Sequence, residues 1–170
     1  MKPLILCLGN DVLSDDGFGF AVADRLHEKY NVIEVADVSA VPIAGFALLD
    51  ALDRRDHVLI VDTIQTRTSA PGTLLEYHAG QYTPSKNLTM SHQISLPHAL
   101  ALGRELGYTM PVQIDVLAVE AEDLETLEES LTPAVKASVE PAVEWIERWV
   151  FSLPELHKER QYDNRIPQPK

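Results

Sequence analysis

The chain alternates short apolar runs with longer stretches in which apolar residues recur every three or four positions. The run from Leu4 to Leu8 is apolar throughout and closes with a Gly-Asn turn signal, which predicts a strand buried on both faces. The run from His57 to Val61 has the same character and is followed directly by Asp62. A β-branched run from Val32 to Val38 predicts a second strand, and Val112 to Val119 predicts a further one.

Stretches with helical spacing separate these strands. A helix is expected from about Gly17 to Tyr30, with apolar residues on one side and charged residues on the other. Further helices are expected from Ala44 to Asp53, from Ile94 to Leu106 and from Leu131 to Phe151. In the last of these, Pro133 lies near the first turn, where proline is tolerated. Pro141 is expected to kink or divide that helix.

One connection departs from the alternation. Residues 63–72 contain Thr, Ser and a Pro-Gly pair, and they show no helical period before the strand-like run from Thr73 to Tyr77. A parallel crossover usually needs a helix, so this strand is expected to be antiparallel and at a sheet edge. The whole pattern predicts a three-layer α/β/α sandwich around a mostly parallel five-stranded sheet. One domain is expected over residues 1–151, followed by an extended or partly disordered tail over 152–170.

Charge narrows the possible partners. Hydrophobic residues make up 45% and charged residues 24%, as in ordinary globular proteins. With 26 acidic and 14 basic residues the net charge is −12, which repels phosphate backbones and anionic lipid, so neither a nucleic acid nor a membrane is an expected partner. The only cysteine, Cys7, lies in an apolar run and is interpreted as a core residue. We expect a cytoplasmic protein, because no signal-peptide cleavage pattern follows the first apolar run. A monomer is expected, since nothing in the sequence demands a larger assembly.

Acidic residues follow the first and third predicted strands. Asp11, Asp15 and Asp16 lie in the loop after the first strand, and Asp62 follows the third. In a flavodoxin-like 2-1-3 strand order these two strands are neighbours, and ligands bind at their carboxyl ends. Asp16 and Asp62 would then face each other, and neighbouring carboxylates favour a bound cation. Helix capping is an equal alternative for Asp15, and a strand-end turn is the ordinary alternative for Asp62.

Among the six histidines, His92 differs because it lies between a polar loop and a predicted helix. An imidazole with two carboxylates is a suitable ligand set for a first-row divalent ion such as nickel. Three protein ligands would leave positions open for groups supplied by a partner. The chain has no His-Glu-x-x-His motif and no Gly-x-Ser-x-Gly elbow, which disfavours an ordinary zinc peptidase and a serine hydrolase.

Taken together, these motifs resemble the endopeptidases that mature the large subunit of nickel–iron hydrogenases. The resemblance extends from about Leu4 to Val150 and rests on motifs in a fixed order and spacing. These are Gly9-Asn10 followed by Asp15-Asp16-Gly17-Phe18-Gly19, then Gly45-Phe46-Ala47-Leu48-Leu49, Val61-Asp62, Pro71-Gly72-Thr73 and Ser91-His92.

The resemblance implies an endopeptidase that removes the C-terminal extension of a nickel-loaded hydrogenase large-subunit precursor. Asp16, Asp62 and His92 match the nickel-contacting positions and are the implied catalytic and metal-binding residues. The nickel would be carried by the substrate, either to polarise the scissile carbonyl or for recognition alone, with an aspartate as general base. Asp37, expected at the end of the second strand, matches a further functional acid, although the family's glycine-rich turn after it is replaced here by residues 38–42.

Two other functions stay open on the residues alone. A receiver-like phospho-acceptor signalling domain has similar aspartates, but it needs a lysine after the fifth strand, where residues 119–123 carry three acids and no lysine. A dinucleotide-binding module would use Gly17, Gly19 and Asp37. However, the third glycine of its fingerprint is missing, and three aspartates in the loop would repel a pyrophosphate.

Overall fold

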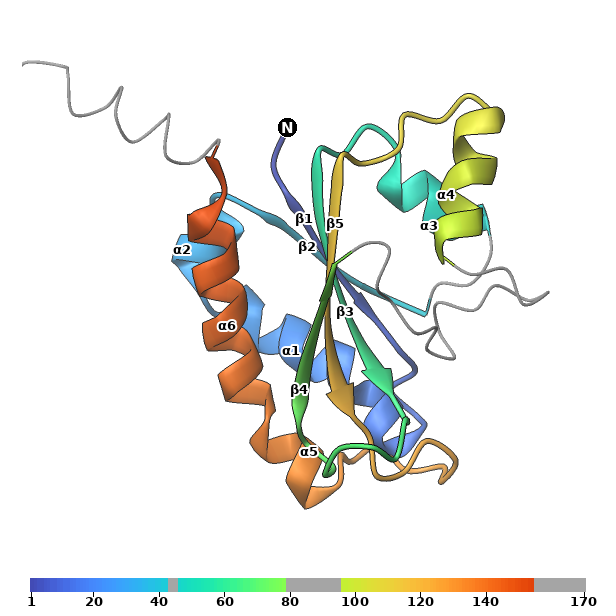
Figure 1. Cartoon of the computed structure of the whole chain (residues 1–170). Coiled ribbons are helices and arrows are strands. Elements are labelled where there is room, and N and C mark those ends of the chain that lie inside the picture. Colours follow the sequence, from blue (N-terminus) through green and yellow to red (C-terminus); the bar gives the residue numbers. More distant parts are fainter. Residues whose placement is uncertain (43–45, 79–95, 155–170) are drawn as a thin grey trace, which may run out of the picture.

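Five strands form one mixed sheet, in the order β2-β1-β3-β5-β4. The computed structural model describes residues 1–42, 46–78 and 96–154, and Figure 1 shows helices on both sides of the sheet. The strands are β1 (Leu4–Leu8), β2 (Asp37–Val41), β3 (His57–Ile64), β4 (Leu74–His78) and β5 (Gln113–Glu120). All neighbours pair in parallel except β4, which pairs antiparallel with β5 at one edge. The predicted fold class and the antiparallel edge strand are confirmed, and the 2-1-3 order on which the site argument depends is present.

The sheet divides the core into two halves, and helices cover each half. The helices are η1 (Ser14–Gly17, a 3-10 turn), α1 (Phe18–His27), α2 (Tyr30–Ile33), α3 (Phe46–Leu52), α4 (Leu96–Glu105), α5 (Pro133–Ala137) and α6 (Val139–Ser152). Ile5 and Cys7 of β1 face the half that includes α1 and α6, whereas Leu4, Leu6 and Leu8 face α3 and α4. Within the described ranges, no helix is long and apolar enough to cross a membrane.

Cys7 occupies the position expected of a core residue. It is fully buried in the half of the core beneath α1 and α6. Burial raises the pKa of its thiol far above the ordinary value, because the thiolate would lose its hydration. The prediction that Cys7 is not a nucleophile is supported by this environment.

The second strand begins later than predicted. The β-branched run starting at Val32 forms the short helix α2 instead, and β2 starts only at Asp37. The reason is the spacing of Val32 and Ala36, which lie four residues apart and are both buried in the same half of the core. Asp37 pairs with Leu4 at the start of β1, so it lies at the opposite end of the sheet from Asp16. Its carboxylate accepts a hydrogen bond of 2.5 Å from the Arg55 guanidinium.

Two other boundaries also differ. The third strand was expected to end before Asp62, but it continues to Ile64 because β5 pairs with it along its full length. The C-terminal helix divides at Ser138 rather than at Pro141, which lies in the first turn of α6, where a missing N–H breaks no helical hydrogen bond. The expected domain boundary after residue 151 stays a prediction, since the segment 155–170 is outside the described residues.

A buried carboxylate joins the edge strand, β5 and α6. Asp115 is 4% exposed, and its Oδ2 accepts hydrogen bonds from Trp149 Nε1 at 2.8 Å and Gln113 Nε2 at 2.6 Å. Its Oδ1 lies 2.6 Å from His78 Nδ1 in β4. Burial alone raises the pKa of Asp115, but the hydrogen bonds from these three side chains outweigh burial and hold the pKa below its ordinary value.

We expect Asp115→Asn to lower the free energy of unfolding at neutral pH by about 1–3 kcal/mol, because the variant loses a charged acceptor shared by three donors. The pKa is lower in the folded state, so the contribution of Asp115 is fully present above the unfolded-state pKa of about 3.9 and is lost as the pH falls through the folded-state value. Urea denaturation at pH 7 and near pH 3 checks this. A stability difference that stays constant between the two pH values would contradict the assignment.

Candidate active site

A glycine determines where the first acidic loop lies against the sheet. Gly9 follows β1 directly and has a φ of +147°, which side chains rarely adopt. A Cβ at this position would lie 2.0 Å from the carbonyl oxygen of Asp16. The backbone N–H of Asn10 donates to that same oxygen at 3.1 Å. The Gly9-Asn10 pair therefore holds the turn η1 against the carboxyl end of β1.

Asp16 lies in this turn with its side chain directed toward β3. The residue is 7% exposed, and its Oδ1 accepts a hydrogen bond of 3.0 Å from the Thr63 hydroxyl. Asp62 is fully buried, and its Oδ1 accepts the backbone N–H of Thr63 at 2.8 Å. One threonine thus donates to both carboxylates, through its side chain to Asp16 and through its backbone to Asp62.

The position of this arrangement follows from the strand register. Pairing between β1 and β3 extends to Cys7 and Val61, so Asp62 lies level with the last residue of β1. Successive side chains of a strand point to opposite faces. Asp62 accordingly shares the face of Ile60, beneath α3 and α4, and Thr63 points to the other face. Asp16, Thr63 and Asp62 therefore lie at the carboxyl ends of neighbouring parallel strands, where α/β sheets bind ligands.

Asp15 has a different role from Asp16, although the two are adjacent in the sequence. It is fully buried, and its carboxylate accepts the backbone N–H groups of Glu122, Asp123 and Thr132 at 2.8–2.9 Å. The Thr132 hydroxyl also donates to it at 3.1 Å. Asp15 therefore fixes the loop after β5 onto the loop after β1, rather than capping a helix.

Two residues of this region escaped prediction. Thr63 lies next to Asp62 in the sequence, but its function as a bridge depends on a contact 47 positions away. Glu120 ends β5 and is 1% exposed, and its carboxylate accepts the Arg67 backbone N–H and the Thr66 hydroxyl, both at 2.7 Å. The sequence signal for Glu120 was a charged residue at the end of a buried strand, which requires hydrogen-bond partners.

His92 lies outside the described residues, so the proposed set of three ligands is not fully placed. Among the residues that the structure describes, no group of three His, Cys, Asp or Glu side chains could hold a metal ion. Asp37 does not join Asp16 and Asp62, because it begins β2 at the far end of the sheet. The same position removes it as the ribose-binding acid of a dinucleotide site, which must lie at the carboxyl end of a strand.

Comparison with known proteins agrees with this fold and identifies the family. The chain belongs to the hydrogenase maturation protease family, whose model matches residues 20–149. It is therefore a peptidase, and the receiver and dinucleotide-binding alternatives are set aside. It is similar to the hydrogenase 2 maturation protease of Escherichia coli K12, at 31% identity over 148 residues, which cover 86% of this chain and 88% of the relative.

Solved structures of similar proteins have the same fold. The hydrogenase-maturating endopeptidase HybD from Escherichia coli superposes with a TM-score of 0.71 at 30% identity, covering 86% of this chain and 90% of that one. The [NiFe] hydrogenase maturation protease HybD from Thermococcus kodakarensis gives a TM-score of 0.67 at 25% identity, covering 88% of this chain and 99% of that one.

We expect Asp15→Ala to lower the free energy of unfolding by about 2–3 kcal/mol, because three partly buried backbone N–H groups and the Thr132 hydroxyl lose a buried charged acceptor. The exposed Asp11 in the same loop provides the control, and Asp11→Ala should change stability by less than about 0.5 kcal/mol. Urea denaturation of both variants checks this. Equal effects of the two substitutions would show that Asp15 does not hold the loops together.

Proposed function

We propose that this protease removes the C-terminal extension of a nickel-loaded precursor of a nickel–iron hydrogenase large subunit. Membership of the hydrogenase maturation protease family supports the choice of substrate. One observation supports the proposed site most directly. Thr63, near the carboxyl end of β3, donates hydrogen bonds to both Asp16 and Asp62. Two carboxylates held at one switch point can receive a cation that arrives with another molecule.

His92 is proposed as the third ligand. It precedes α4, and α4 packs with Ile60 on the sheet face that Asp62 shares. Oxygen and imidazole nitrogen donors together suit a divalent first-row ion such as nickel. Three ligands from the protease leave room for the groups that already hold the ion in the precursor. The nickel is part of the substrate in this proposal, and the protease needs no metal of its own.

The energetic consequence is discrimination between two forms of the precursor. Bonds from Asp16, Asp62 and His92 to nickel form only when the ion is present, so they add affinity for the loaded form alone. Asp62 is fully buried, which means that the docking precursor must open the site before the ion can reach this carboxylate. We propose recognition as the first role of the ion, with Asp16 or Asp62 as general base toward the attacking water.

We expect Asp16→Asn, Asp62→Asn and His92→Ala each to reduce processing at least about a hundredfold, because each removes one side chain that would bind the nickel ion of the precursor. The matched controls are Asp24→Asn and His27→Ala, which alter exposed residues of α1 and should retain full activity. The readout is loss of the extension, followed by mass spectrometry of the precursor. Circular dichroism confirms that each variant is folded, and full activity of all three site variants would refute the site.

The nickel dependence is a separate prediction. Purified protease mixed with nickel-loaded precursor should release the extension, whereas nickel-free precursor should stay uncut under the same conditions. The physical reason is that the nickel-free form cannot gain the metal–ligand bonds that offset opening of the buried site. Restoring nickel to the nickel-free precursor should restore cleavage, and equal cleavage of both forms would refute recognition of the ion.

A further inference from the structure

The edge strand β4 carries a row of backbone groups that point away from the sheet. Hydrogen bonds in an antiparallel pair alternate, so every second residue directs its N–H and C=O to the partner and the others direct theirs outward. Glu120 exchanges its bonds with the turn before β4, accepting from the Gly72 N–H at 2.8 Å and donating to the Thr73 carbonyl at 2.9 Å. Leu75 and Tyr77 continue this set toward β5. Leu74, Glu76 and His78 therefore direct their backbone groups to the outer edge.

The start of β4 is shaped by a turn and a bulge. Thr73 N–H donates to the Ala70 carbonyl at 3.1 Å, and Gly72 has a φ of +81°, as expected for a Pro-Gly type II turn. Together with the two bonds to Glu120, the same glycine forms a G1 bulge, which increases the local twist of the strand. The turn consequently leans toward α5, and a Cβ on Gly72 would lie 2.5 Å from the Ala134 carbonyl oxygen.

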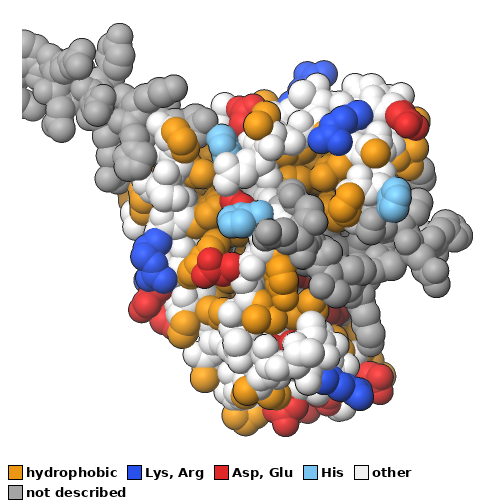
Figure 2. Space-filling model, in the orientation of Figure 1, with side chains coloured by type: hydrophobic (Ala, Val, Ile, Leu, Met, Phe, Trp, Pro, Cys, Tyr) orange, Lys and Arg blue, Asp and Glu red, His pale blue; other side chains and the backbone are white. Residues whose placement is uncertain are grey.

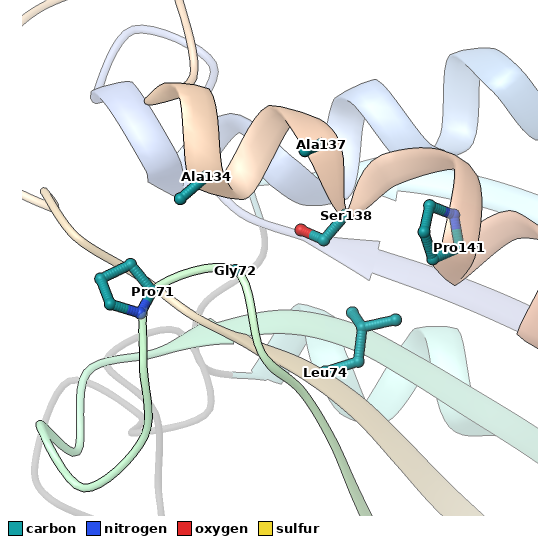
Figure 3. Close-up of a pocket in the computed structure, with 7 residues that line it drawn as sticks. All are labelled: Pro71, Gly72, Leu74, Ala134, Ala137, Ser138 and Pro141. Carbon is teal, nitrogen blue, oxygen red and sulfur yellow. The ribbon is translucent and has the colours of Figure 1, made fainter.

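A groove opens beside this edge, between the start of β4 and the junction of α5 with α6. Its volume is about 360 Å³, and Figure 3 shows the side chains around it. None of the lining residues is charged; the strand side contributes Pro71, Gly72 and Leu74, and the helical side includes Ala134, Ala137 and Ser138. The hydroxyl of Ser138 donates to the Val135 carbonyl at 2.6 Å, so it adds little polarity to the groove.

We propose that β4 and this groove hold an extended segment of the precursor's C-terminal extension, added to the sheet as a further strand. This inference rests on the proposed function. Main-chain hydrogen bonds to Leu74, Glu76 and His78 would supply affinity, and an apolar side chain of the segment would fill the groove. Within the part of the chain that the structure describes, no other strand pairs with this edge.

The negative charge of Glu76 indicates which second residue the bound segment carries. Glu76 is exposed in the middle of β4, and its carboxylate accepts the Trp145 indole N–H at 2.5 Å, which fixes its position beside the edge. The whole chain carries a net charge of −12, and Figure 2 shows both acidic and basic side chains on the face of the molecule that it draws. The segment that fits best has an apolar residue for the groove and a basic residue near Glu76.

The position of the edge relative to Asp62 sets how far this segment lies from the cut bond. Leu74 pairs with Val119, which pairs with Thr63, so the three residues lie in one line across the sheet. A strand added outside β4 would lie three strand spacings from β3, or about 14 Å. An extended chain covers that distance in about four or five residues. The docking segment is therefore a secondary contact, beyond the residues that flank the scissile bond.

Two pairs of variants of the full chain test this proposal. Glu76→Pro removes an outward N–H without removing a bond to β5, since proline is tolerated where the N–H of an edge strand faces outward. Its control is Glu76→Gln, which keeps that N–H and an acceptor for Trp145. Ala137→Leu fills the groove, and Ala101→Leu makes the same change on an exposed position of α4. The measurements are KM and kcat for nickel-loaded precursor, with thermal unfolding of each variant.

We expect Glu76→Pro and Ala137→Leu each to raise KM about tenfold, equivalent to about 1.4 kcal/mol of binding, and to change kcat less than about twofold. Ala101→Leu should retain the wild-type constants. Glu76→Gln, which removes only the charge that faces the basic residue, should raise KM less than Glu76→Pro does. If Glu76→Pro fails to fold, Ala137→Leu decides the question alone.

Other outcomes would overturn the proposal. Unchanged KM in Glu76→Pro and Ala137→Leu, with wild-type protein still cleaving the precursor, would refute the edge contact and leave the proposed function intact. A reduced kcat with unchanged KM would also refute it. A wild-type dimer that Glu76→Pro converts to a monomer in sedimentation would assign the edge to a second copy of this chain. Failure of wild-type protein to cleave the precursor would refute the proposed function, and the edge contact with it.

Discussion

The loops around the candidate site meet at one buried carboxylate. Asp15 accepts three backbone N–H groups and one hydroxyl from the loop that follows β5. Backbone bonds between the same two loops add to these contacts, from the Ser14 N–H to the Glu128 carbonyl and from the Glu128 N–H to the Val12 carbonyl. Through these bonds Asp15 helps to keep the turn η1 in place. Asp16 belongs to the same turn and lies within hydrogen-bond distance of Thr63. Of these two adjacent aspartates, Asp15 has a structural role and Asp16 belongs to the candidate site.

Much of the fold could be predicted because β1, β3 and β5 are apolar on both faces, which is a strong signal for buried parallel strands. The antiparallel edge strand could be predicted from the lack of a helix before Leu74. The start of β2 was missed because β-branched residues at 32–35 suggested a strand, while the burial of Val32 and Ala36 on one face favoured a helical turn. The four-residue spacing of Val32 and Ala36 was present in the sequence, but only their burial in the core decides between this helical period and the β-branched run.

The candidate site was predictable to a similar degree. Asp16 and Asp62 could be selected because a 2-1-3 strand order brings acids that follow β1 and β3 to one switch point, and because both match positions in the family that the chain resembles. The bridging role of Thr63 could not be selected, since threonine is common in strands and its hydroxyl partner lies far away in the sequence. Asp37 was selected from the family resemblance as a further functional acid, but it lies at the other end of the sheet from Asp16 and Asp62. Its ion pair with Arg55 gives it an evident structural role instead.

The location of Asp62 within β3, rather than after it, has a consequence for how this region can change during evolution. Asp62 pairs with Ala118 of β5 and Thr63 pairs with Val119, and this pairing holds β3 in register to its last residue. Inserting or deleting a single residue ahead of Asp62 would exchange it and Thr63 between the two faces of the sheet. The carboxylate would then point toward α1, and the hydroxyl would turn away from Asp16. Substitutions along this strand can accumulate gradually, whereas a change in its length would remove both groups at once.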